Sequence, residues 1–172
     1  MTGFLRFIGL LNAAVWCGSA IFVAIGIPAL FSPELKRLIT PIGVGYAAET
    51  LVARYFVVQY WCGGIALAHL AAEWFYFGRP LRRLHLGLVL GVFIVGLLGG
   101  LWAQPRMRAL HVAKYFARTN EEQVHAAKLF TTWHAVSMSV NLLVILCLVW
   151  YFWRVFREQQ PERFMSLSKI RG

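Results

Sequence analysis

Residues 83–106 read RLHLGLVLGVFIVGLLGGLWAQPR, in which 22 residues without a charge separate Arg83 from Arg106. A bilayer core of about 30 Å is spanned by about 20 apolar residues at helical rise, so this stretch is long enough to cross a membrane. Backbone groups in lipid are satisfied only in helices or closed barrels, and a continuous apolar run of this length indicates a helix. The stretch therefore predicts a transmembrane helix.

Three further uncharged runs share this length and composition, so the sequence predicts an all-α integral membrane protein with four transmembrane helices. The connection between the third and fourth spans is amphipathic. Within it Thr119 and Glu122 fit a capping box, which starts a helix that runs on into the fourth span. We expect one membrane domain over residues 1–172, a four-helix bundle with an amphipathic helical extension between helices three and four. The expected spans are residues 5–31, 51–76, 83–104 and 129–153.

The composition of the whole chain supports this class. Of 172 residues, 59% are hydrophobic and 14% are charged, whereas a soluble domain is nearer half apolar and about a quarter charged. Seventeen Lys and Arg against seven Asp and Glu make the chain basic, with a net charge of +10. The basic residues lie between the apolar runs and form no single patch, which argues against a nucleic-acid partner. The expected partner is the lipid bilayer.

An even number of spans places both termini on one side of the membrane, which we call the N side. Nine basic residues lie on the N side and eight on the opposite, far side, which is not a usable positive-inside bias. We take the N side as cytoplasmic. Trp and Tyr gather at membrane interfaces, and both sides have such residues. They are Trp74, Tyr76, Trp150, Tyr151 and Trp153 on the N side, and Trp102 and Trp133 on the far side.

Three polar side chains form a stripe on the fourth helix. His134, Ser137 and Asn141 follow the spacing i, i+3, i+7, so their directions fall within about 60° of one another. A polar side chain in a span is costly and is a functional candidate. We expect the stripe to meet the far-side ends of helices two and three in one polar cluster. Such a cluster either binds a small molecule or ion, or holds the helices together by hydrogen bonds. The predicted partners are Arg54, Tyr55, Gln104 and Arg106.

A second polar group lies toward the N side. His69 and Glu73 are one helical turn apart on the second helix, and His85 opens the third. Imidazole and carboxylate are ligand types for several transition metals, and the two histidines are also the pair that a heme would need. We predict no cofactor, with a metal or a heme at these residues as the alternatives.

Small residues on the third helix predict close helix packing. Gly87 and Gly91 form one pair, and Gly96 and Gly100 form another. Small residues let membrane helices approach closely, and at about 100° per residue the two pairs point in nearly opposite directions. The third helix is therefore expected to touch two neighbours.

The sequence contains no hydrolase, kinase, zinc-protease or dinucleotide-binding motif, which favours a non-enzymatic protein. The leading interpretation is an accessory or structural subunit of a larger membrane complex, or a small homo-oligomer. The first alternative is transport or binding of a small molecule or metal through the stripe on helix four. A further alternative is a heme-dependent membrane oxidoreductase.

Five motifs within residues 4–153 point to a known family. They are Trp16-Cys-Gly18 with Phe22, Ile27-Pro-Ala-Leu-Phe31, Arg54-Tyr55-Phe56, Gln104-Pro105-Arg106, and His134-x-x-Ser137-x-x-x-Asn141-Leu142. With these motifs the chain resembles the four-span membrane proteins of unknown function related to transmembrane protein 205. The resemblance implies a four-helix membrane protein and no assigned activity. The layout is more distantly similar to the membrane protoporphyrinogen oxidase and copper-resistance families, whose first span carries a histidine that residues 4–11 lack.

Overall fold

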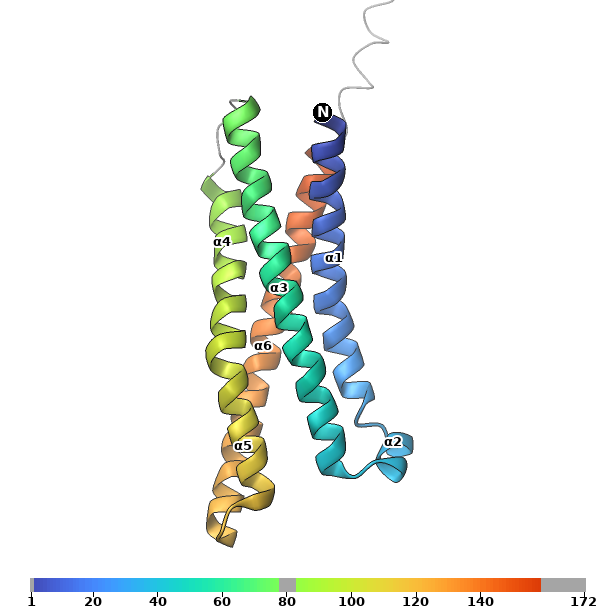
Figure 1. Cartoon of the computed structure of the whole chain (residues 1–172), viewed down its shortest axis with the longest axis vertical. Helices are drawn as coiled ribbons and strands as arrows, with labels where there is room; N and C mark the ends of the chain where they lie inside the picture. Colours follow the sequence, from blue (N-terminus) through green and yellow to red (C-terminus); the bar gives the residue numbers. More distant parts are fainter. Residues whose placement is uncertain (1, 78–82, 159–172) are drawn as a thin grey trace, which may run out of the picture.

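The computed structural model describes residues 2–77 and 83–158, and all secondary structure in these ranges is helical. Four long helical stretches run side by side in a bundle (Figure 1), so the predicted all-α fold is confirmed. In these ranges four stretches are long and apolar enough to cross a membrane. The elements are α1 (Thr2–Ala29), α2 (Pro33–Leu38), α3 (Pro41–Phe77), α4 (Arg83–Leu98), the π-helix η1 (Gly99–Ala103), α5 (Gln104–Phe116) and α6 (Asn120–Glu158).

At the far side, α3 and α6 begin well before the predicted spans. Helix α3 begins at Pro41, ten residues before the predicted start. It begins there because proline suits the first helical position and because Thr40 Oγ1 accepts a hydrogen bond from the Gly43 amide at 3.2 Å. Helix α6 begins at Asn120 for a similar reason: the predicted capping hydrogen bond forms, from the Glu122 amide to Thr119 Oγ1 at 3.2 Å.

The core of the bundle is made where α1 packs against both α3 and α6 (Figure 1). Helix α4 packs on α3, whereas α5 packs mainly on α6. Many large apolar side chains around the bundle remain exposed, as expected for a surface that faces lipid. Fully buried core residues include Ala13, Trp16, Ala20, Val89 and Leu148.

Tryptophans mark two levels along the bundle. Trp102 and Trp133 meet edge to face with ring centroids 5.3 Å apart, and we call this pair the far belt. Trp150 and Trp153, near the end of α6, form the N belt, and the guanidinium groups of Arg154 and Arg157 lie over these rings. Trp133 and Trp153 are 20 residues apart on one helix, or about 30 Å, which is the thickness of a bilayer core.

The far end of the bundle therefore continues past the far belt. Helix α5 has 13 residues, and at 1.5 Å per residue it projects about 20 Å. The first 13 residues of α6, 120–132, run beside it. We call residues 33–50 and 104–132 the far-side extension. It has a small core of its own, in which Val44, His111 and Ala126 are buried.

The two glycine pairs of helix α4 and its continuation differ in their surroundings. A Cβ on Gly96 would lie 3.7 Å from Gln59, and one on Gly100 would lie 2.9 Å from the ring of Phe56, so both face α3. Gly87 and Gly91 have no atom within 4 Å of such a Cβ. The described residues thus supply no close neighbour for Gly87 and Gly91, and the packing contact predicted for this pair stays a prediction.

Candidate functional site

A buried chain of hydrogen bonds crosses the bundle between three helices. The Trp16 indole N–H of α1 donates to the side-chain oxygen of Gln59 on α3, and the Gln59 amide donates to the Tyr55 hydroxyl. The Tyr55 hydroxyl in turn donates to Asn141 Oδ1 of α6 at 3.1 Å. We call these four residues the polar chain. It lies deep in the membrane span, since Trp16 is close to the middle of the apolar segment Phe7–Ala29.

The polar chain is shielded from its surroundings. The exposed fractions of Trp16, Gln59 and Tyr55 are 0%, 3% and 9%. One turn before Trp16, Asn12 Nδ2 donates to the Cys62 carbonyl at 2.9 Å, which adds a second polar link between α1 and α3. Buried polar groups are costly unless they are hydrogen-bonded, and here the donors and acceptors match along the chain.

The chemistry of the polar chain is that of neutral groups. An indole, two amides and a phenol exchange hydrogen bonds, and the chain includes no carboxylate or imidazole. Hydrogen bonds of this kind between membrane helices contribute about 0.6 kcal/mol on average, yet they specify which helices pair. The arrangement fixes the register of α1, α3 and α6.

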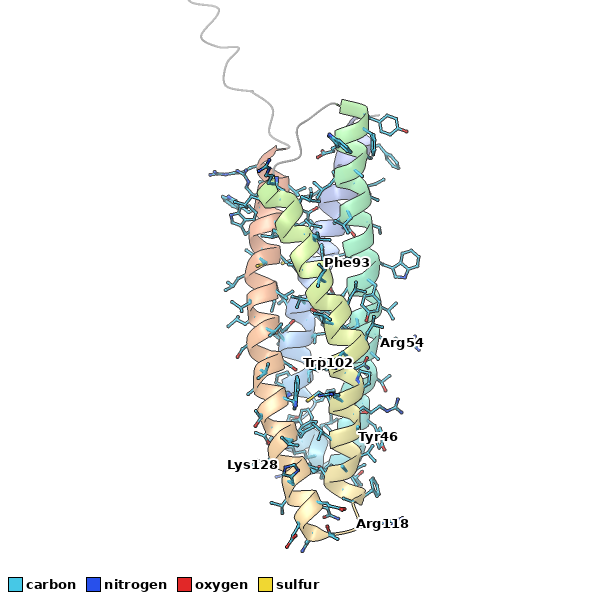
Figure 2. All side chains as sticks on the ribbon, turned by 90° about the vertical axis from the view of Figure 1, so that its left-hand side faces the viewer. Tyr46, Arg54, Phe93, Trp102, Arg118 and Lys128 are labelled. Atoms are coloured by element: carbon cyan, nitrogen blue, oxygen red, sulfur yellow. The ribbon has the colours of Figure 1, made fainter. Side chains whose placement is uncertain are left out.

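The predicted far-side cluster forms only in part. Tyr55 and Asn141 form a hydrogen bond with each other, but Arg54 lies exposed on the outer face of α3 (Figure 2). Placing Arg54 and Tyr55 in one site was wrong, because consecutive helical residues point about 100° apart. When Tyr55 faces the interior, Arg54 faces outward.

The other predicted members separate for a different reason. Near His134, α6 packs along α5, and Trp133 of α6 meets Trp102 of η1, whereas α3 and α6 are not packed against each other in the described residues. His134 is exposed and stacks on Phe130 of its own helix, with ring centroids 6.1 Å apart. Ser137 and Gln104 are half-buried. The exposed Arg106 side chain lies over the Trp102 ring at 4.7 Å, so it belongs to the far belt.

The histidines of the predicted metal or heme site contact different helices. His69 Nε2 lies 3.0 Å from the Leu5 carbonyl of α1. His85 Nε2 accepts a hydrogen bond from Arg154 of α6 at 3.2 Å. Glu73 is half-buried one turn after His69. Within residues 2–77 and 83–158, no group of three or more His, Cys, Asp or Glu side chains is placed to hold a metal ion.

A second buried polar contact lies in the far-side extension. His111 Nδ1 of α5 is 2.8 Å from Glu49 Oε1 of α3, and Arg108 approaches the other carboxylate oxygen at 3.8 Å. His111 is 5% exposed. Its ring lies against Gly45, where a Cβ would overlap the imidazole, so only glycine leaves room for the ring. The rings of Tyr46, Tyr115 and Phe130 surround it at centroid distances of 5.3 to 5.8 Å.

Sequence reasoning did not select the residues at the centre of these contacts. Gln59 is the only amide in the apolar part of α3, and its spacing of one turn from Tyr55 was a usable signal. Trp16 and Glu49 carried no such signal, because their partners lie on other helices.

Comparison with known proteins identifies a family for most of this structure. A family model described as a domain of unknown function (DUF4149) matches residues 11–115. This segment contains three of the four members of the polar chain and both members of the Glu49–His111 pair. Neither the curated proteins nor the solved structures include a match to the chain.

Proposed function

The chain belongs to the DUF4149 family, and we propose that it serves as a non-enzymatic accessory subunit of a membrane complex, which it contacts through its far-side extension. The proposal includes the relationship to the proteins around transmembrane protein 205, on the motifs of residues 104–106 and 134–142. It also includes an N side in the cytoplasm, so the extension faces the opposite compartment.

The observation that carries the proposal is apolar surface beyond the far belt. Phe116 at the end of α5 is 63% exposed, Val124 at the start of α6 is 69% exposed, and Leu38 of α2 is 82% exposed. A shallow groove of about 510 Å³ runs along α5 from Pro105 to Ala117. Lipid tails end near the belt, and exposed apolar surface outside lipid is typical of protein interaction sites.

The bundle interior supports the same interpretation. Among the described residues, the buried side-chain nitrogen and oxygen atoms have hydrogen-bond partners except Glu49 Oε1 and His111 Nδ1. These two atoms face each other at 2.8 Å. Within residues 2–77 and 83–158, no buried side-chain nitrogen or oxygen atom is thus left facing an empty space, which favours a structural role over transport through the stripe on helix four.

The test is the composition of the complex extracted from its native membrane. We would extract the full chain directly into polymer-bounded lipid discs and measure the stoichiometry of bound protein by native mass spectrometry. The double variant Phe116→Ser/Val124→Ser should lower the amount of partner extracted with the chain at least tenfold. The control Arg118→Ser changes a polar residue at the same tip and should retain it.

Three results would contradict the proposal. The first is a wild-type disc that contains a single chain and lipid only, and the second is a partner that the double variant retains. The third is a stoichiometric ligand in the purified chain: a Soret band in the visible spectrum would favour the heme oxidoreductase, and a bound metal would favour metal binding or transport.

A further inference from the structure

The outer face of α3 has a positive charge at the level of the far belt. Contacts of Gly63 with Phe93, of Gly96 with Gln59 and of Gly99 with Phe56 set the antiparallel register of α3 and the α4–η1 helix. The same register places Arg54 opposite Leu101 and Trp102. Arg54 is exposed and lies at the edge of the bundle (Figure 2). Its long side chain therefore reaches the headgroup region.

An apolar surface continues from Arg54 toward the membrane interior on the same face. Val57, Trp61 and Ile65 follow Arg54 at i+3, i+7 and i+11, and they are 45%, 71% and 39% exposed. Eleven residues of helix rise about 16 Å, which is half of a bilayer core of about 30 Å. We call these four residues the α3 strip. It offers a cation at headgroup depth and an apolar contact as long as one acyl chain.

We propose that the α3 strip binds one anionic phospholipid, with its phosphate on Arg54 and an acyl chain along Val57, Trp61 and Ile65. Arginine holds phosphate oxygens through its planar fork of N–H donors. The contact with the lipid is assigned to Arg54 alone. The far side as a whole has an excess of positive charge, which favours anionic over zwitterionic lipid in general. Its basic side chains are Lys36, Arg37, Arg54, Arg106, Arg108, Lys114, Arg118 and Lys128, against Glu34, Glu49, Glu121 and Glu122.

Charge also argues against a second copy of the chain on this face. Two copies inserted in the same orientation and related by a twofold axis present identical faces to each other. Arg54 would then lie near Arg54 of the other copy, and like charges repel. The nearest carboxylate along α3 is Glu49, which already faces His111 and Arg108.

Trp61 provides a second observation. Tryptophan gathers at membrane interfaces, yet Trp61 lies seven residues from Arg54, or about 10 Å inside the far belt. A flat ring that is 71% exposed at this depth is a broad surface for an acyl chain. The strip lies between the belts, so this proposal is independent of the protein partner of the far-side extension.

The experiment measures lipid retention by the full chain. Purified wild type and variants would be equilibrated with phosphatidylglycerol or phosphatidylcholine, and the fraction of chains with one bound lipid would be read by native mass spectrometry. Arg54→Gln should lower phosphatidylglycerol retention about fivefold, the factor that corresponds to about 1 kcal/mol per basic residue at an anionic surface. Arg54→Lys should retain most of the binding, and Trp61→Ala should lower it as well.

Matched controls are available on other faces. Arg118→Gln removes a far-side charge beyond the belt, and Leu143→Ala shortens an apolar side chain of α6 that is 62% exposed. Both should retain phosphatidylglycerol as wild type does. Equal retention by Arg54→Gln and wild type would overturn the proposal, as would an equal loss in Arg118→Gln or equal retention of the two lipids. All four side chains are exposed, so circular dichroism should show the same fold in every variant.

Discussion

Replacing Gln59 with Leu tests the polar chain at its centre. The leucine side chain has a similar size but makes no hydrogen bond, so the bonds to Trp16 and Tyr55 are both lost. Hydrogen bonds between membrane helices contribute about 0.6 kcal/mol on average and about 1.7 kcal/mol at most. The fully buried Trp16 N–H is also left without an acceptor, which costs about 1–3 kcal/mol. We expect Gln59→Leu to lower the free energy of unfolding by about 2 kcal/mol.

The assay is reversible unfolding in mixed micelles by titration with sodium dodecyl sulfate, followed by far-ultraviolet circular dichroism. Ser139→Ala is the control, because Ser139 is exposed and its hydroxyl bonds only the Ala135 carbonyl of its own helix, at 3.1 Å. It should change stability by less than about 0.5 kcal/mol. In a Trp16→Phe background, Gln59→Leu should cost less, since no N–H is left unpaired. The reasoning would be refuted if Gln59→Leu lowered the free energy of unfolding no more than Ser139→Ala does. It would also be refuted if Gln59→Leu had the same effect in the wild-type and Trp16→Phe backgrounds.

Three further predictions concern the far-side extension. Gly45→Ala should destabilise the protein by about 1–3 kcal/mol in the detergent titration, because a Cβ would overlap the His111 ring. Gly87→Ala, where a Cβ meets no atom within 4 Å, should be neutral or slightly stabilising in the same titration. His111→Leu leaves a partly exposed carboxylate without its closest partner and should cost about 2 kcal/mol, measured by the same detergent titration. In Phe116→Cys the new thiol should react with a membrane-impermeant maleimide added to the far side, whereas in Leu98→Cys it should not. No labelling of Phe116→Cys would place the extension in lipid.

The sequence was sufficient to predict the fold class but not the ends of the helices. An uncharged run stops at the first charged residue, so hydropathy placed the end of the third span near residue 104. The helix continues to Phe116 because α6 packs along it and both have helix-forming sequences outside the apolar run. The capping box at Thr119 and Glu122 was readable, since its hydrogen bond depends only on residues three apart.

The candidate site was predictable only where a signal lay within one helix. Tyr55 and Asn141 stood out as polar residues in apolar spans, and they are bonded to each other. Their link to Trp16 runs through Gln59, and it depends on the axial offset between α1 and α3. That offset is set by packing between helices, such as His69 against Gly9, and a single sequence does not encode it in any local pattern.

Helix α6 is one unbroken rod of 39 residues, or about 58 Å. Its first turns belong to the far-side extension and its last turns carry the N belt. One continuous helix therefore connects the two surfaces of the membrane. A tilt of about 5° at one end would displace the other by about 5 Å over this length. Sharp kinks arise mainly at proline and glycine, and α6 contains neither, so we expect a displacement of the far-side extension to move the N belt as well.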